Sequence, residues 1–193
     1  MADPGLHFAD LRLFERIQAR DQAALADLYD RHARLLFSVA LRILRDRGEA
    51  EDVLQDVFVR VWDRVDSYDS ALGTPLAWLV RVTRNRAIDR VRARAVRPAL
   101  ADEGESSVVL LEPSRDPDPE AQASLSEAGR ALGSALSHLP DEQRILIERA
   151  FYGGLTHTEL AAAYNLPLGT VKTRIRTGVQ ALRAALGQTG GVS

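Results

Sequence analysis

Apolar side chains return along most of this chain at steps of three and four residues, the spacing that places them on one face of an α-helix. The first half contains three such stripes, over about residues 11–19, 21–44 and 48–65. Asp21 stands where an N-cap is expected before the second stripe. The pattern therefore predicts a bundle of consecutive helices at the N-terminal end.

Residues 66–73 interrupt these stripes with a polar sequence that predicts a loop. Thr74 and Pro75 follow, and they supply an N-cap and a proline suited to the first helical turn. We expect a long helix from there to about residue 96. No stretch alternates with a period of two, and no Asn-Gly or Asp-Gly pair separates two apolar runs, so we expect no strand.

The C-terminal third predicts four shorter helices. Two cover about residues 125–138 and 140–151, and the third opens at a capping box made by Thr156 and Glu159. The last begins near Gly169 and directs a row of polar and basic residues outward. A short helix, a tight turn and a basic second helix are typical of a helix-turn-helix, which inserts its second helix into the major groove of DNA. An ordinary helical hairpin with a solvated basic face is the alternative.

Composition adds a division into domains. The chain has 193 residues, 46% of them hydrophobic and 27% charged, which is enough for one ordinary core or two small ones. Residues 97–123 contain four prolines and seven acidic side chains without a helical stripe, so they predict a flexible acidic linker. The predicted fold class is all-α, with small helical domains at residues 1–96 and 124–187 and a tail at 188–193.

Basic charge is concentrated in two places, although the formal net charge is only −2. Seven arginines and one acid lie between residues 81 and 97, and one lysine and three arginines follow Glu159 with no acid among them. The acidic linker separates the two groups. Two separate basic helices predict two separate contacts with nucleic acid.

The helix after Pro75 has one apolar side, which predicts core. Trp78, Arg81, Asn85 and Arg92 lie on the opposite side. An exposed indole among guanidinium groups suits single-stranded DNA, because a base stacks on the ring while the arginines follow the backbone. The alternative is that Trp78 packs beneath a neighbouring helix and that the arginines are only solvated.

The helix predicted over residues 48–65 has an acidic outer face. This face carries Asp52, Gln55, Asp56, Val59 and Asp63. Such a face is commonly exposed to solvent and nothing more. A binding interpretation pairs its carboxylates with arginines of a partner helix.

The sequence contains no motif for catalysis or metal binding. The four histidines are scattered away from carboxylates at metal-ligand spacing, and there is no cysteine, phosphate-binding loop or nucleophile elbow. We therefore expect no catalytic residue, no metal site and no cofactor. The start lacks a signal-peptide pattern and no apolar stretch approaches the length of a membrane span, so we expect a cytoplasmic protein without membrane insertion.

Several of these segments together resemble the extracytoplasmic-function group of bacterial sigma factors, within the sigma-70 family. The segments similar to region 2 of that family are residues 28–37, 50–62 and 75–90. The segments similar to region 4 are residues 139–144, 151–156 and 166–176. Thr173 and residues 177–179 depart from the usual family residues, which bears on promoter preference.

The resemblance implies three functional surfaces. The helix that docks on the polymerase β′ coiled coil would use Asp52, Gln55, Asp56, Val59 and Trp62, although periodicity places Trp62 inward. The minus-ten strand would be opened and held by Trp78, Arg81, Arg84, Asn85 and Arg92. The minus-thirty-five element would be read as duplex by Thr170, Lys172, Thr173, Arg174 and Arg176. The loop at residues 66–73 would receive a flipped base.

The implied function is promoter-specific initiation by core RNA polymerase, with no catalysis by this chain. The implied partners are core polymerase through its β′ coiled coil and β flap, promoter DNA, and an anti-sigma protein. Two other classes stay open from the residues alone. A polymerase-independent helix-turn-helix regulator would bind duplex DNA unaided, and a helical adaptor would use the acidic face with no role in DNA binding.

Overall fold

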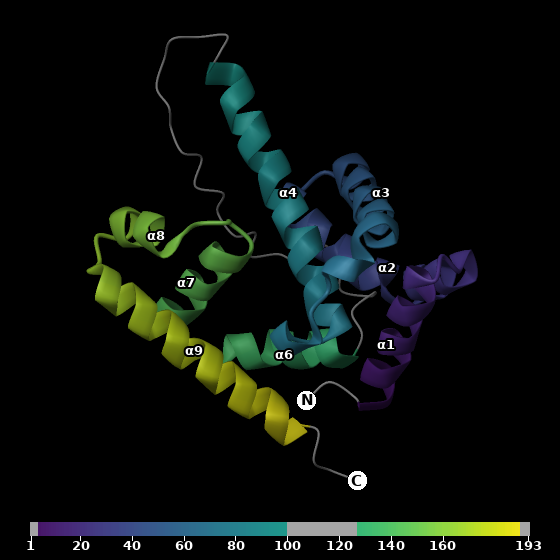
Figure 1. Ribbon diagram of the computed structural model, residues 1–193. Helices are drawn as coiled ribbons and strands as arrows, with labels where there is room; N and C mark the ends of the chain where they lie inside the picture. Colours follow the sequence, from purple (N-terminus) through teal and green to yellow (C-terminus); the bar gives the residue numbers. More distant parts are fainter. Residues whose placement is uncertain (1–3, 100–126, 190–193) are drawn as a thin grey trace. The chain divides into compact units, whose positions relative to one another are not determined.

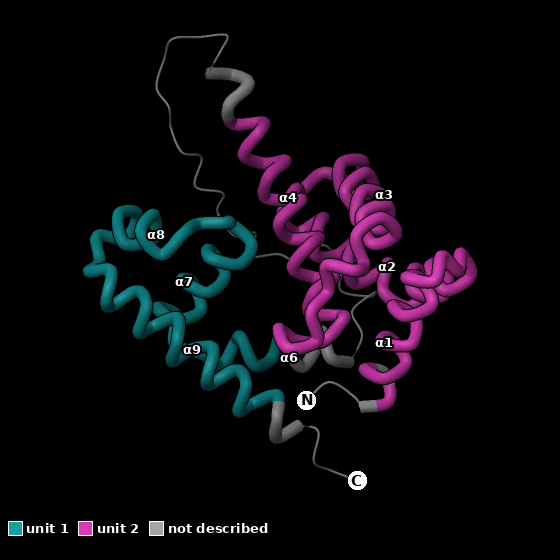
Figure 2. The backbone as a smooth tube through the Cα atoms, viewed as in Figure 1, with its two compact units in different colours: residues 1, 110–193 teal, residues 2–109 magenta. Residues whose placement is uncertain are grey.

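The computed structural model describes residues 4–99 and 127–189 and divides the chain into two compact units (Figures 1 and 2). One unit comprises residues 2–109, and the other comprises residues 110–193 together with Met1. Within the described ranges every regular element is a helix. The prediction of an all-α fold with two helical domains is confirmed.

The described part of the N-terminal unit is a bundle built around one central helix. Its elements are α1 (Pro4–Gln18), α2 (Gln22–Leu44), α3 (Arg47–Arg64), the 3-10 turns η1 (Val65–Ser67) and η2 (Ser70–Leu72), and α4 (Pro75–Ala99). Helix α2 packs against α1, α3 and α4. The predicted apolar stripes meet there, because Leu28, Leu36, Val57 and Leu79 are fully buried.

Polar side chains set the helix starts in this unit. Asp21 caps α2 and Thr74 caps α4, each by accepting hydrogen bonds from backbone N–H groups of the first turn. Asp46, at the break between two predicted stripes, caps α3 in the same way. Arg45 ends α2 in the left-handed region at φ 55°. The predicted N-caps Asp21 and Thr74 are confirmed.

Helix α1 begins at Pro4, well before the predicted start near residue 11. The apolar pattern missed its first turns because the polar residue Asp10 is buried there, at 3% exposure, while Phe8 is 64% exposed. A pattern of apolar residues predicts the buried face of a helix only where the buried residues are apolar, and Asp10 interrupts that pattern.

Asp10 is buried against two cationic or ionisable side chains of α2. Its Oδ2 lies 2.9 Å from His32 Nε2, and its Oδ1 accepts a 2.7 Å hydrogen bond from Arg31 Nη1. Burial alone would raise the pKa of Asp10, but the hydrogen bonds with His32 and Arg31 and their charges together outweigh it, so the pKa is lowered. The ionised carboxylate therefore ties α1 to α2.

The Asp10→Asn variant is expected to lose about 1–3 kcal/mol of stability at neutral pH, because it leaves buried donors of α2 without their carboxylate. A carboxyl group whose pKa is lowered by folding stabilises the protein above its unfolded-state pKa, near pH 4, and this contribution disappears as the pH falls through the folded-state pKa. The variant should therefore lose less stability than the wild type on acidification. Urea denaturation at several pH values, followed by tryptophan fluorescence, measures both effects.

Both tryptophans of the chain, Trp62 and Trp78, lie in the N-terminal unit, so their fluorescence reports on that unit alone. Asp27→Asn is a matched control, because it removes only an exposed ion pair with Arg16 and should change stability by less than about 1 kcal/mol. Equal losses in the Asp10 and Asp27 variants would contradict the expected effect of burial.

The described part of the C-terminal unit is organised around its last helix. Its elements are α6 (Glu127–Ser137), α7 (Asp141–Phe151), α8 (His157–Ala163) and α9 (Leu168–Thr189). Helix α9 contacts α6, α7 and α8. Two small apolar clusters form between these helices. One contains Ala135, Leu139 and Leu182, and the other contains Leu146, Leu160 and Val171.

Two predicted boundaries shift. Helix α4 continues to Ala99, three residues into the predicted linker at 97–123, and α9 continues to Thr189, two residues into the predicted tail. The rest of the predicted linker and tail lies outside the described residues. In the part of the chain that the structure describes, no helix is long and apolar enough to span a membrane.

Candidate nucleic-acid and protein interfaces

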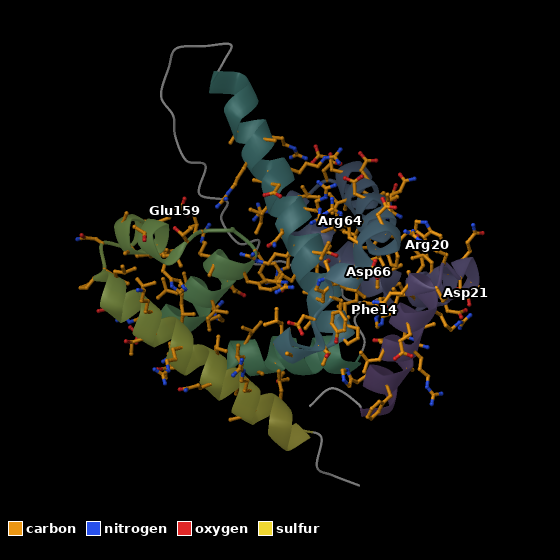
Figure 3. The ribbon with its side chains drawn as sticks, in the orientation of Figure 1. Phe14, Arg20, Asp21, Arg64, Asp66 and Glu159 are labelled. Atoms are coloured by element: carbon orange, nitrogen blue, oxygen red, sulfur yellow. The ribbon has the colours of Figure 1, made fainter. Side chains whose placement is uncertain are left out.

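The capping box predicted at the start of α8 is present. Thr156 Oγ1 accepts a 3.2 Å hydrogen bond from Glu159 N, and the Glu159 carboxylate accepts a 2.6 Å hydrogen bond from Thr156 N (Glu159 is labelled in Figure 3). Asn165 then turns the chain in the left-handed region, at φ 49°. Leu160 of α8 and Val171 of α9 are both completely buried in one cluster. Helices α8 and α9 therefore form the predicted helix-turn-helix.

The residues predicted to contact duplex DNA lie in the first three turns of α9. The exposed ones are Lys172, Thr173 and Arg176. Thr170 is half-buried, and Arg174 makes a 2.6 Å ion pair with Glu142 of α7. Three of the five side chains are thus exposed, and the other two, Thr170 and Arg174, are half-buried. Arg174 also holds α9 against α7.

Gly178, for which the sequence offered no role, lies where α9 crosses α7. A Cβ atom at this position would be 2.6 Å from Ile147 Cδ1 and 3.3 Å from Gln143 Cβ. The absence of a side chain therefore allows the close approach of the two helices. The helical propensity lost at a mid-helix glycine, roughly 1 kcal/mol relative to alanine, is offset by this packing.

Trp78 does not lie on the surface, and the prediction of an outward indole is wrong. Its side chain is 6% exposed, with ring centroids 5.7 Å from Phe14 and 6.3 Å from Tyr68 (Phe14 is labelled in Figure 3). Helix α4 is covered by α2 and α3 and also by α1, so two of its sides are buried. A single buried side, as expected from periodicity, does not account for the aromatic cluster of Phe14, Tyr68 and Trp78, which lies on the second one.

The rest of the predicted DNA face of α4 remains on the surface. Arg81, Asn85 and Arg92 are exposed. Arg84 is half-buried and donates a 3.1 Å hydrogen bond from Nη1 to Asn85 Oδ1. Burial, and secondarily the charge of Arg92, lower the pKa of Arg84 from its ordinary value. Arginine stays protonated in proteins, so the Arg84 guanidinium keeps its positive charge.

The loop between α3 and α4 is held by its own hydrogen bonds. Tyr68 Oη donates a 2.8 Å hydrogen bond to the Gly73 carbonyl, and Asp69 caps η2 by accepting from Ala71 N at 2.9 Å. Gly73 has φ 139°, which side chains disfavour. Leu72 is 72% exposed at the tip of this loop. Tyr68 thus joins the loop to the aromatic cluster below it.

The acidic outer face of α3 is exposed as predicted. Its surface residues include Asp52, Gln55, Asp56 and Val59, with Val59 56% exposed. Trp62 is half-buried: the Arg20 guanidinium lies 5.3 Å from its ring centroid, and Arg20 Nη1 donates a 3.0 Å hydrogen bond to the Trp62 carbonyl. The inward placement expected from periodicity is therefore only partial.

Three arginines of α4 face α3 rather than the predicted DNA face. Arg86 lies 3.7 Å from Asp56, Arg90 lies 2.7 Å from Asp52, and Arg94 Nε donates a 2.8 Å hydrogen bond to Glu49 Oε1. In the sequence these arginines belong to the same basic run as the residues of the predicted DNA face. Their four-residue spacing was the signal, because it places all three on one side of a helix.

The described residues contain no group of three or more histidine, aspartate or glutamate side chains placed to hold a metal ion. The chemistry that the described surfaces offer is that of charge, hydrogen bonding and apolar contact. Two basic helix faces and one acidic helix face are the candidate sites.

Comparison with known proteins gives two family matches. Sigma-70 region 2 matches residues 28–97, and Sigma-70, region 4 matches residues 135–184. The ECF RNA polymerase sigma factor SigK of Mycobacterium tuberculosis is 36% identical over 178 residues, covering 90% of this chain and 91% of that protein. The SigK of Mycobacterium sp. (strain JLS) is 33% identical, covering 92% and 90%.

Solved structures are also similar. SigE of Rhodobacter sphaeroides, in complex with the anti-sigma ChrR, is 33% identical with a TM-score of 0.47, covering 92% of this chain and 98% of that chain. CnrH, in complex with the cytosolic domain of CnrY, is 26% identical with a TM-score of 0.43, covering 93% and 98%.

Proposed function

Because this chain belongs to the sigma-70 family, as an extracytoplasmic-function sigma factor, we propose that it docks on core RNA polymerase through α3 and contacts promoter DNA through α4 and α9. The protein directs promoter-specific transcription initiation and is not an enzyme, since nucleotide addition belongs to the polymerase. Its place of action is the cytoplasm, where that polymerase works. The observation that carries the proposal is the pair of basic helix faces in two separate units, one beside an acidic helix.

The polymerase contact is assigned to the outer face of α3. Asp52 and Asp56 offer exposed carboxylates to arginines of the β′ coiled coil. Val59, which lies between Asp56 and Trp62 in the sequence, offers an exposed apolar contact. Gln55 adds a neutral hydrogen-bonding group on the same side. A mixture of charge and apolar area is what a specific protein interface needs.

The minus-ten contact is assigned to the exposed side of α4. Arg81, Arg84 and Arg92 bring positive charge to a single strand, and Asn85 brings an amide that both donates and accepts hydrogen bonds. Trp78 enters this assignment as a support for the α3–α4 loop through Tyr68, because a buried indole has no face for a base. The loop at residues 66–73 remains the proposed receptacle for a flipped base.

The minus-thirty-five contact is assigned to the start of α9. Lys172, Thr173 and Arg176 are exposed where a recognition helix meets base edges and phosphates, and Thr170 begins the same surface. Arg174 contributes by positioning the helix through Glu142. The same unit would contact the polymerase β flap. An anti-sigma protein, which the family relationship implies, completes the proposed set of partners.

Run-off transcription with purified core polymerase tests the function. On a template carrying the promoter upstream of its own gene, the protein should produce a specific transcript that core polymerase alone does not. Arg176→Ala should reduce this transcript about tenfold, the effect of losing one good base or phosphate contact. Thr177→Ala, on the same helix, is the control and should retain most of it. If the proposed polymerase contact is wrong, the wild-type protein will not co-migrate with core polymerase.

A polymerase-independent regulator is not favoured, because the relative that aligns with 90% of this chain, at 36% identity, is a sigma factor. It would predict stable, specific binding to duplex promoter DNA without polymerase. The adaptor hypothesis is weaker still, since it gives no role to the helix-turn-helix formed by α8 and α9.

A further inference from the structure

The acidic face of α3 and the arginines of α4 form one continuous line of ion pairs. We call it the ionic seam and define it by Glu49, Asp52 and Asp56 of α3 and Arg86, Arg90 and Arg94 of α4. Arg90 bridges two of the acids, 2.7 Å from Asp52 Oδ2 and 3.8 Å from Glu49 Oε2. Every arginine of the seam therefore has at least one carboxylate partner within α3.

The seam lies at the surface. Its arginine side chains are 36–44% exposed, Asp52 and Asp56 are 59% and 51% exposed, and Glu49, the least exposed member, is 26% exposed. Exposed ion pairs of this kind contribute little to stability, since water and salt compete for both partners. The pairs can therefore be exchanged for intermolecular ones without unfolding the bundle.

The seam joins the two proposed binding surfaces of the N-terminal unit. Asp52 and Asp56 are the carboxylates proposed to meet cationic residues of the polymerase. Arg86, Arg90 and Arg94 lie on the helix proposed to meet DNA phosphates, but each is neutralised by α3. An arginine held by a carboxylate attracts a phosphate less than one released from it.

We propose that Arg86, Arg90 and Arg94 are a second row of phosphate-binding residues that α3 masks, and that a cationic partner bound to Asp52 and Asp56 releases Arg86 and Arg90. This inference rests on the proposed function of α3 and α4. Because coupling between two binding sites is reciprocal, DNA bound to the released arginines strengthens the partner's hold on α3 by the same factor. The seam thus links binding of the polymerase to binding of the DNA.

Glu49→Gln opens the seam without touching the proposed polymerase contacts. In anisotropy titrations of the full chain with a labelled single-stranded oligonucleotide, this variant should bind about two- to five-fold more tightly than the wild type. Release of Arg94, whose carboxylate partner is Glu49, should also steepen the dependence of log affinity on log salt by up to about 0.7. Glu51→Gln is the matched control, because it removes the same charge from α3, and within the described residues Glu51 forms its ion pair with Arg47 of its own helix. It should change affinity less than twofold.

Arg94→Gln, made in the wild type and in the Glu49→Gln background, separates release from general electrostatics, because Glu49 is the partner of Arg94 whereas Arg90 also pairs with Asp52. It should leave the wild type alone nearly unchanged, and it should remove most of the gain made by Glu49→Gln. In the complete polymerase complex, where α3 is occupied, Arg90→Gln should weaken promoter binding about two- to five-fold even with Glu49 intact.

The inference is overturned if Glu49→Gln and Glu51→Gln raise affinity equally, if Arg94→Gln has the same effect in both backgrounds, or if Arg90→Gln leaves promoter binding by the complete polymerase complex unchanged. Arg92→Gln tests the proposed DNA face separately and should weaken binding in every background. If Arg92→Gln weakens binding while the seam variants show no coupling, the proposed function stands and the seam inference fails. If the seam variants show coupling while Arg92→Gln has no effect, the proposed minus-ten face fails and the seam stands.

Discussion

Replacing Trp78 by alanine is expected to destabilise the N-terminal unit by about 3–5 kcal/mol. The indole is buried between Phe14 of α1 and Tyr68 of the α3–α4 loop, and its removal leaves a cavity that two separate elements would have to close. A loss of this size is a large part of the stability of a small domain. Transcription should therefore fail through unfolding of the unit as a whole, at temperatures where the wild type is active.

Urea denaturation of the full chain measures this effect, because Trp62 remains as a fluorescent reporter of the same unit. Trp78→Phe is the control: it keeps an aromatic ring in the cluster and should lose less stability than the alanine variant. If the Trp78→Ala protein is as stable as the wild type but cannot open promoters, the result supports direct stacking of the indole on a base.

Reversing the charge of Asp56 is expected to abolish stable binding to core polymerase. Asp56 is 51% exposed on the proposed docking face, and an arginine there would oppose the cationic residues of the polymerase. Like charges brought together at an interface cost several kcal/mol, which corresponds to a loss of affinity of more than about a hundredfold. Co-migration with core polymerase in gel filtration, and run-off transcription, should both be lost.

Asp30→Arg provides the control for Asp56→Arg, since Asp30 is an exposed aspartate on α2 and the change in charge is identical. It should keep both activities. Urea denaturation of the two variants shows whether their folds are equally stable. If the Asp56→Arg protein still co-migrates with polymerase, the assignment of α3 to the docking surface is contradicted.

The local sequence was sufficient to predict the helices and most of the residues at which they begin and end. Asp21, Thr74 and Thr156 cap helices with their own side chains, and such bonds form between residues two or three apart in the chain. Apolar stripes predicted the cores around Leu28 and Val171 for a similar reason, because the helical repeat alone decides which residues share a face. The family resemblance then related these elements to function.

Charge alone gave only a coarse view of the candidate sites. The sequence predicted a basic α4 and an acidic α3, and both surfaces exist. It did not reveal that Arg86, Arg90 and Arg94 face the acids of α3, because the crossing of two helices decides which residues meet. The sequence likewise predicted a DNA contact for Arg174 and did not reveal its ion pair with Glu142 of α7.

The sequence by itself determined the all-α class and the helix-turn-helix, since both depend on residues close together in the chain, and its motifs in both halves indicated the family. Only the tertiary structure decided how single residues are used. Trp78 is buried because α1 and the loop cover a side of α4 that periodicity left open, and Asp10 is buried because α2 supplies His32 and Arg31. Gly178 allows α9 to approach α7 closely. Each of these outcomes depends on a contact between segments distant in the chain, which local periodicity does not encode.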